Sequence, residues 1–246
     1  MPWFDENKSN TNFMIIGNSC AGAGLLHHCL RTHPEIVCHI DLLHENEKIR
    51  KAEHESYFGD SAQAFDWFVP AQISAEQYLA NKIFDNNLRD EKTIGVTLTY
   101  ADVAKYDLWH FIDQMYRIGD FYLIHVTRNP VACFLVQELN KSRLKRNLDI
   151  NEAQLIKFVR DHLAFELKIN ELVADKVVLP YHELIMDYTG VMSKLLPFME
   201  VNPNKLGKPK LSVVQQNLRS SISNLNWLRD KLPGDVLEQL DSFLLF

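Results

Sequence analysis

The chain has 246 residues, of which 46% are apolar and 24% are charged, and its formal net charge is −6 at neutral pH. This composition is typical of a globular protein and argues against the disordered and fibrous classes. The acidic balance also argues against broad nucleic-acid binding, which needs a basic surface. It does not exclude a small anionic ligand, because a pocket can be locally positive in an acidic protein.

Three features of the sequence bear on location and metal binding. No uncharged apolar run approaches the roughly 18 residues of a transmembrane segment. The opening MPWFDENKSNTNF is polar and acidic, unlike a secretory signal, so we expect a cytoplasmic protein. The spacing of the cysteines fits no usual zinc pattern, so we expect free thiols and no metal site at Cys20, Cys29, Cys38 and Cys133.

Short apolar runs that predict strands alternate with segments of helical periodicity. In chain order we expect a strand at 13–16, a helix at 22–31, a strand at 36–38, helices at 43–54 and 74–84, a strand at 94–98, a helix at 101–117, a strand at 122–126, helices at 130–145 and 151–174, a strand at 177–179, and helices at 188–200, 220–230 and 233–244. Strands this apolar are typical of a parallel sheet that is buried on both faces. The sequence therefore predicts one α/β domain over 1–246, with a P-loop-like central parallel sheet flanked by helices and a mostly helical C-terminal third.

The turn after the first predicted strand has the glycine spacing of a phosphate-binding loop. Gly17 and Gly22 stand as in a Walker A motif, but Ala23-Gly24 follows where that motif has Lys-Ser/Thr. The missing side chains argue against nucleoside triphosphate hydrolysis, whereas small residues and a helix N-terminus still suit an anion. A tight strand-to-helix turn without a ligand is the alternative interpretation.

This stretch resembles the opening of the sulfotransferase superfamily, which reads Gly-x-Pro-Arg/Lys-Ser-Gly-Thr-Thr-x-Leu after a strand. Gly17, Gly22 and Leu26 match, and Cys20 stands in place of the basic residue. The segment YLIHVTRNP resembles the second cofactor motif of the family, with Arg128 followed by Asn-Pro.

Three further segments are similar to the family in the same order along the chain. His33-Pro34 and the later Asp41-Leu-Leu-His44 resemble bacterial carbohydrate sulfotransferases. The segment VVLPYHEL is similar to the strand and turn that carry the matching Tyr181. The segment SVVQQNLRSSISNL resembles the closing segment of bacterial and nodulation-type members.

The resemblance implies sulfuryl transfer from 3′-phosphoadenosine 5′-phosphosulfate (PAPS) to a hydroxyl of a carbohydrate or small metabolite, without a metal. By position, the catalytic candidates are Asp41 as base, His44 as its alternative, and Cys20 at the place of the basic residue. The resemblance assigns the donor to the backbone N–H groups of Ala21, Gly22, Ala23 and Gly24 and to the side chains of Arg128, Gln137 (or Ser142), Tyr181 and Arg219.

Departures from the family keep other interpretations open. Cys20, Thr97 and Gln215 are neutral where relatives are often basic. The second hypothesis is therefore a catalytically inactive sulfotransferase-fold protein that binds a nucleotide, a glycan or a protein. A P-loop nucleotide kinase is the third hypothesis. Structural roles also remain for the candidates: Arg128 in a strand-to-helix turn, Asp41 as a helix N-cap, and Tyr181 at the edge of the core.

The basic run Lys141, Arg143, Lys145 and Arg146 is either a solvated face or part of the cleft. Neither the acceptor nor the oligomeric state has a recognisable signature.

Overall fold

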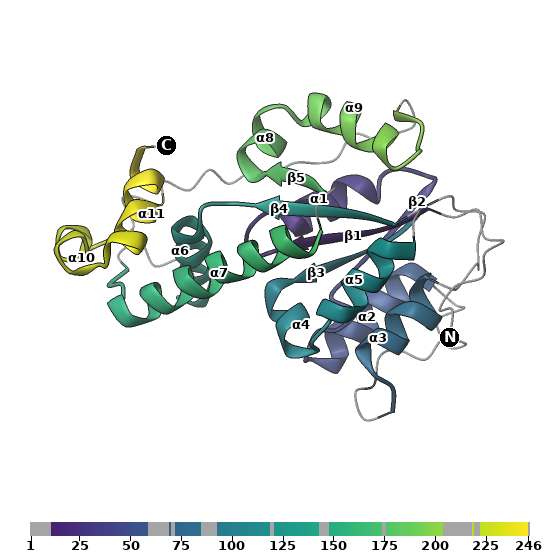
Figure 1. Cartoon of the computed structure of the whole chain (residues 1–246), viewed down its shortest axis with the longest axis horizontal. Coiled ribbons are helices and arrows are strands. Elements are labelled where there is room, and N and C mark those ends of the chain that lie inside the picture. Colours follow the sequence, from purple (N-terminus) through teal and green to yellow (C-terminus); the bar gives the residue numbers. More distant parts are fainter. Residues whose placement is uncertain are drawn as a thin grey trace.

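The centre of the protein is a five-stranded parallel sheet with the strand order β2-β3-β1-β4-β5 (Figure 1). In the computed structural model these strands are β1 (Thr11–Gly17), β2 (Ile36–Ile40), β3 (Thr93–Thr99), β4 (Phe121–Thr127) and β5 (Val177–Pro180). All five predicted strands are confirmed, as is the α/β class. The structure describes residues 11–58, 69, 72–84, 93–118, 121–142, 148–173, 176–203, 218 and 222–245.

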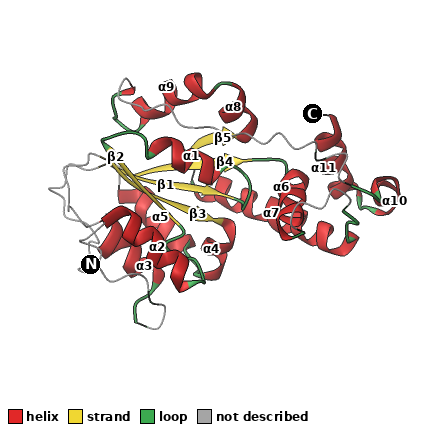
Figure 2. Cartoon of the chain, turned by 180° about the vertical axis from the view of Figure 1, so that it is seen from behind, coloured by secondary structure: helices red, strands yellow, loops and turns green. Residues whose placement is uncertain are grey.

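Helices cover both faces of the sheet, as its apolar strands require. One face packs against α1 (Ala23–Leu30), α8 (Tyr181–Met186) and α9 (Tyr188–Phe198). The other packs against α3 (Ala75–Tyr78), the π-helix η2 (Leu79–Phe84), α4 (Tyr100–Lys105) and α5 (Trp109–Ile118). The view from behind shows the two layers on opposite sides of the strands, with α2 (Glu47–Phe58) on the side of α5 (Figure 2).

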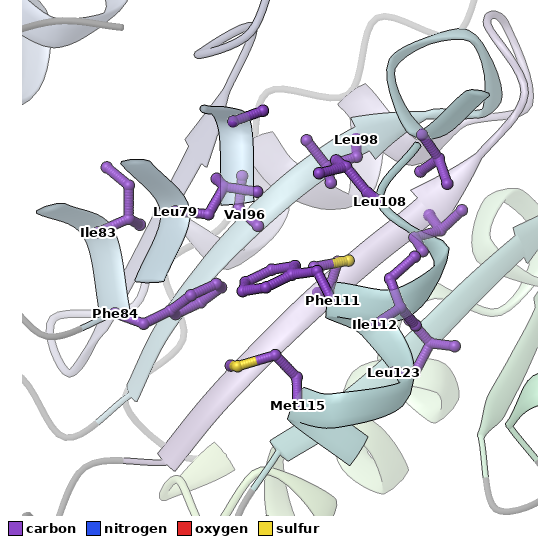
Figure 3. Packing of buried hydrophobic residues seen from close by; sticks show 14 of the residues in the cluster. Leu79, Ile83, Phe84, Val96, Leu98, Leu108, Phe111, Ile112, Met115 and Leu123 are labelled. Carbon is purple, nitrogen blue, oxygen red and sulfur yellow. The ribbon is translucent and has the colours of Figure 1, made fainter. Parts of the chain in front are cut away.

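Figure 3 shows the core on the α5 side, where side chains from η2 and α5 meet the inner faces of β3 and β4. The ring of Phe84 lies 6.4 Å from that of Phe111 and 6.0 Å from that of Phe121. This fully buried layer fixes β3 and β4 beside β1, and it therefore fixes the positions at which these strands end.

A separate apolar cluster joins α6 (Pro130–Lys141), α7 (Glu152–Leu172), α10 (Leu225–Lys231) and α11 (Gly234–Leu245). Figure 1 shows these helices beyond one end of the sheet, with α7 running from them back toward the strands. The prediction that the C-terminal third is mostly helical holds for the residues that the structure describes. That 1–246 forms a single domain stays a prediction.

Two local predictions were wrong. The helix expected at 101–117 is two helices, α4 and α5, because Asp107 adopts a left-handed φ of 47° that ends the first one. The segment after β5, expected to be a turn, forms the short helix α8. Within the described ranges, no helix has an apolar stretch long enough to cross a membrane.

Candidate functional site

A cavity of about 460 Å³ opens at the carboxyl ends of the strands. The chain leaves β1 toward β2 and leaves β4 toward β5, so the order of the strands reverses between β1 and β4. In open parallel sheets this switch point is where ligands bind. The cavity is lined by the loop after β1 and by Asp41, Thr99, Arg128 and Tyr181, which end or directly follow the other four strands.

The loop between β1 and α1 presents backbone N–H groups to this cavity. Cys20 and Gly22 adopt left-handed φ angles of 68° and 106°, which turn the chain sharply into α1. The helix has no side-chain cap and no acidic residue in its first turn. In the described part of the chain, the N–H groups of Gly22, Ala23 and Gly24 meet no acceptor. All three residues line the cavity, so they offer an anion both donors and the positive end of a helix dipole.

Ala21 differs from its neighbours. Its N–H donates to the carbonyl oxygen of Asn18 at 2.9 Å, and the residue is fully buried behind the loop. The amide that closes the turn is therefore not available to a ligand, which leaves Gly22 to Gly24 as the donors.

Arg128 and Tyr181 form a wall of the cavity against Gly22. The guanidinium carbon of Arg128 lies 4.1 Å from the centre of the Tyr181 ring, and its Nη1 donates to the carbonyl oxygen of Cys20 at 2.9 Å. A Cβ on Gly22 would lie 2.5 Å from Cδ2 of Tyr181, so the ring packs directly on the glycine. Among the described residues that line the cavity, Arg128 is the only cation.

Asp41 follows β2 and faces the cavity with its backbone in the left-handed region, at a φ of 57°. Burial raises the pKa of its carboxyl group above the ordinary value, and the nearby His44 partly offsets this. A carboxylate with a raised pKa is suited to act as a base toward a hydroxyl.

Asp41→Asn is expected to stabilise the fold slightly at neutral pH. The raised pKa means that the folded state resists ionisation, so Asp41 lowers stability once the pH exceeds its unfolded value near 4. The carboxyl group is partly exposed, so the gain stays under about 1 kcal/mol. Urea unfolding at pH 7 and at about pH 3 measures it: the two proteins should differ only at the higher pH. An equal shift at both pH values would attribute the effect to the backbone conformation.

The remaining sequence candidates lie away from the cavity or outside the described residues. His44 points back along its own loop, where its Nδ1 accepts the N–H of Asn46 at 3.0 Å. Gln137 does not line the cavity, although its neighbour Val136 does. The hydroxyl of Ser142 donates to the carbonyl oxygen of Leu139 and so caps α6. Arg219, Gln215 and the basic residues at 143, 145 and 146 lie outside the described residues.

Cys20 lines the cavity with its side chain half-buried. Burial raises the pKa of the Cys20 thiol, and the charge of Arg128 opposes that shift. A thiol with a raised pKa stays neutral near pH 7, so this position supplies no charge to a ligand.

Among the cavity residues to which sequence reasoning assigned no role are the polar Asn18 and Thr99. Thr99 is the last residue of β3, beside the switch point. Its place at the end of an apolar run could have marked it as a cavity residue. Asn18 is distinguished only by a contact with His162, 144 residues away, for which the sequence carries no signal. No group of three or more His, Cys, Asp or Glu side chains in the described ranges is arranged to hold a metal.

Two solved structures share this architecture. The sulfotransferase domain of the Synechococcus PCC 7002 olefin synthase has a TM-score of 0.57 and 16% identity, over 98% of this chain and 97% of that one. The sulfotransferase from Alicyclobacillus acidocaldarius has a TM-score of 0.51 and 16% identity, over 95% and 96%. No family model and no curated protein matches the sequence.

These similarities cover nearly the whole chain, and they show its fold. The protein has the sulfotransferase fold, as the sequence resemblance led us to expect.

Proposed function

We propose that this protein transfers a sulfuryl group from PAPS to a hydroxyl of a carbohydrate or small metabolite. The observation that carries the proposal is the meeting, in one cavity, of the unpaired N–H groups of Gly22 to Gly24 with the guanidinium of Arg128. The fold supports the same reading, because both neighbours reported above carry the name sulfotransferase.

Each group of the cavity has its own part in the proposed reaction. The N–H groups of the loop hold the 5′ phosphosulfate, whose charge grows on the bridging oxygen as the sulfur–oxygen bond breaks. Arg128 pairs with the 3′-phosphate, for which its planar fork is suited. The acceptor oxygen forms the new bond to sulfur, and its proton passes to Asp41. The products are the sulfate ester and 3′-phosphoadenosine 5′-phosphate (PAP).

Calorimetry with PAP tests donor binding, with magnesium–adenosine triphosphate as the rival ligand. Of these two ligands, only PAP should bind. In a separate assay, labelled sulfate should be transferred from PAPS to at least one of a set of sugar and small-alcohol acceptors. Tight binding of magnesium–adenosine triphosphate with none of PAP would instead favour a nucleotide kinase.

A catalytically inactive binding protein is the second candidate, and one observation favours it. The position that is basic in relatives holds the neutral thiol of Cys20, and Arg128 is already engaged with the Cys20 carbonyl and the Tyr181 ring. PAP binding without any sulfuryl transfer across the acceptor set would support this candidate over the enzyme.

Cys20→Arg is expected to strengthen PAPS binding by about tenfold. A guanidinium at this position adds a charge-assisted contact beside the loop donors, and the backbone is already in the left-handed conformation that the position requires. Competition between PAPS and PAP in calorimetry measures the gain. Cys20→Ser is the control, since it changes the side chain without adding charge; an equal gain there would rule out the electrostatic explanation.

A further inference from the structure

A buried histidine on α7 anchors the start of the loop that faces the cavity. The Nδ2 of Asn18 lies 2.6 Å from the Nδ1 of His162, and the Nε2 of His162 lies 3.1 Å from Oε1 of Glu166. The His162 side chain is 1% exposed and that of Glu166 is 25% exposed. The three residues form a chain of contacts from the cavity wall through the interior to the surface of α7.

The order of donors and acceptors along this chain follows from Glu166. A carboxylate only accepts hydrogen bonds, so the Nε2 of His162 carries a hydrogen and donates a hydrogen bond to Oε1 of Glu166. The atom of Asn18 that faces the ring is Nδ2, an amide nitrogen that only donates, so the Nδ1 of His162 is the acceptor of this contact. Reversing the amide would place two acceptors, Oδ1 and Nδ1, against each other. The pair His162–Glu166 therefore selects one orientation of the Asn18 side chain.

The surroundings hold the imidazole in place. Its ring packs edge-on against Tyr100 at 5.3 Å and lies 6.3 Å from the Phe158 ring. Tyr100 is itself fixed by a 2.6 Å contact between its hydroxyl and the Nε2 of the buried His125. An imidazole packed in this way has little freedom to follow a moving loop, so the loop must conform to it.

Asn18 is thus held at two points. Its carbonyl oxygen accepts the N–H of Ala21, which closes the turn, and its side-chain nitrogen is tied to His162. Its Oδ1 has no donor among the described residues, although the residue lines the cavity. The anchored side chain therefore offers a fixed acceptor to a ligand that carries an O–H or N–H group.

We propose that His162, supported by Glu166, is a positioning residue of the candidate site: it orients the Asn18 amide so that Oδ1 accepts a hydrogen bond from the bound nucleotide. The proposal rests on the proposed function for the identity of the ligand, and on the Asn18–His162 contact for the anchoring itself.

Two substitutions of His162 separate its two contacts. His162→Asn keeps an acceptor near the place of Nδ1 and loses the contact with Glu166. His162→Gln keeps a donor near the place of Nε2 and loses the contact with Asn18. The full-length chain and its His162→Asn, His162→Gln and Asn18→Ala variants are titrated with PAP, and their urea unfolding is measured alongside.

We expect Asn18→Ala and His162→Gln to weaken PAP binding about five- to tenfold, and His162→Asn to restore most of the affinity. Because the two residues act through one contact, the double variant Asn18→Ala/His162→Gln should bind no more weakly than either single variant. Equal affinity losses in His162→Asn and His162→Gln, in step with their stability losses, would reduce His162 to a packing role and overturn the proposal.

A second readout needs no ligand. Hydrogen exchange of the Asn18 side-chain amide, followed by nuclear magnetic resonance, should be slow in the wild type and in His162→Asn and fast in His162→Gln. Fast exchange in all three proteins would overturn the anchoring. Failure of the wild type to bind PAP, with the exchange pattern intact, would overturn the proposed function and leave the anchoring supported.

Discussion

Arg128→Ala is expected to weaken PAP binding by about 10- to 100-fold. Arg128 is the only cation among the described residues that line the cavity, and a hydrogen bond between an arginine and a phosphate is worth about 1.5–3 kcal/mol. The substitution also removes the contact with the Cys20 carbonyl, so the loop loses a tether as well as a charge. Calorimetry at fixed ionic strength measures the change in affinity.

Two controls separate these contributions. Arg128→Lys keeps the charge and loses the planar fork, so it should recover part of the affinity. Arg160→Ala removes an exposed arginine that pairs with Asp235 at 2.9 Å, and it should leave PAP binding unchanged. If Arg128→Ala binds PAP like the wild type, the 3′-phosphate does not contact Arg128 and the proposed donor orientation is wrong.

The parts of the site that lie at strand ends could be predicted from the sequence. Apolar runs show where each buried strand stops, and Asp41, Arg128 and Tyr181 all follow such runs. Since the carboxyl ends of parallel strands lie along one edge of the sheet, residues at these positions are brought to the same side of the molecule. The structure places all three around the cavity.

The remaining details depend on backbone angles and on contacts between distant elements. The amide of Ala21 is lost to a turn whose closure needs left-handed residues, and Cys20 gives no sign in the sequence that it will adopt such a conformation. The break between α4 and α5 at Asp107 has the same origin. The link from Asn18 to His162 crosses 144 residues, so no local periodicity reports it.

The charges that line the cavity bear on which of the two candidate functions applies, the enzyme or the inactive binding protein. The proposed donor, PAPS, carries a phosphate and a phosphosulfate, and the described residues that line the cavity include one guanidinium and a helix N-terminus. Backbone donors are sufficient to hold an anion. Charge that develops on a leaving oxygen is stabilised best by a fixed donor or cation beside it, and the loss of one such group commonly costs about 10²–10³ in rate. Under the proposed function, we therefore expect the neutral Cys20 to lower the rate of transfer more than the affinity for the donor.

Gly22→Ala is expected to destabilise the protein by about 2–4 kcal/mol and to weaken PAP binding. Gly22 has a φ of 106°, a conformation that costs an L-residue about 1–2 kcal/mol. The added Cβ would also lie 2.5 Å from Cδ2 of Tyr181, so the ring must move away from both the loop and Arg128. Urea unfolding gives the change in stability, and calorimetry with PAP gives the change in affinity.

Gly24 provides the matched control two residues along the same loop. A Cβ there would lie 3.6 Å from Cδ1 of Ile40, an ordinary contact, and the residue is already inside α1. Gly24→Ala should therefore leave stability unchanged or raise it by up to about 1 kcal/mol, because alanine favours the helix.

The Gly22→Ala substitution can also be made in a Tyr181→Ala protein. This separates the loss of stability that comes from backbone strain from the loss that comes from the clash with the ring. Removing the ring removes the clash, so Gly22→Ala should then cost only the backbone strain of about 1–2 kcal/mol. The same loss of stability with and without the ring would mean that Tyr181 does not pack on the loop. No loss in either background would mean that the turn does not need a glycine, and the geometry assigned to the N–H groups of Gly22 to Gly24 would fail with it.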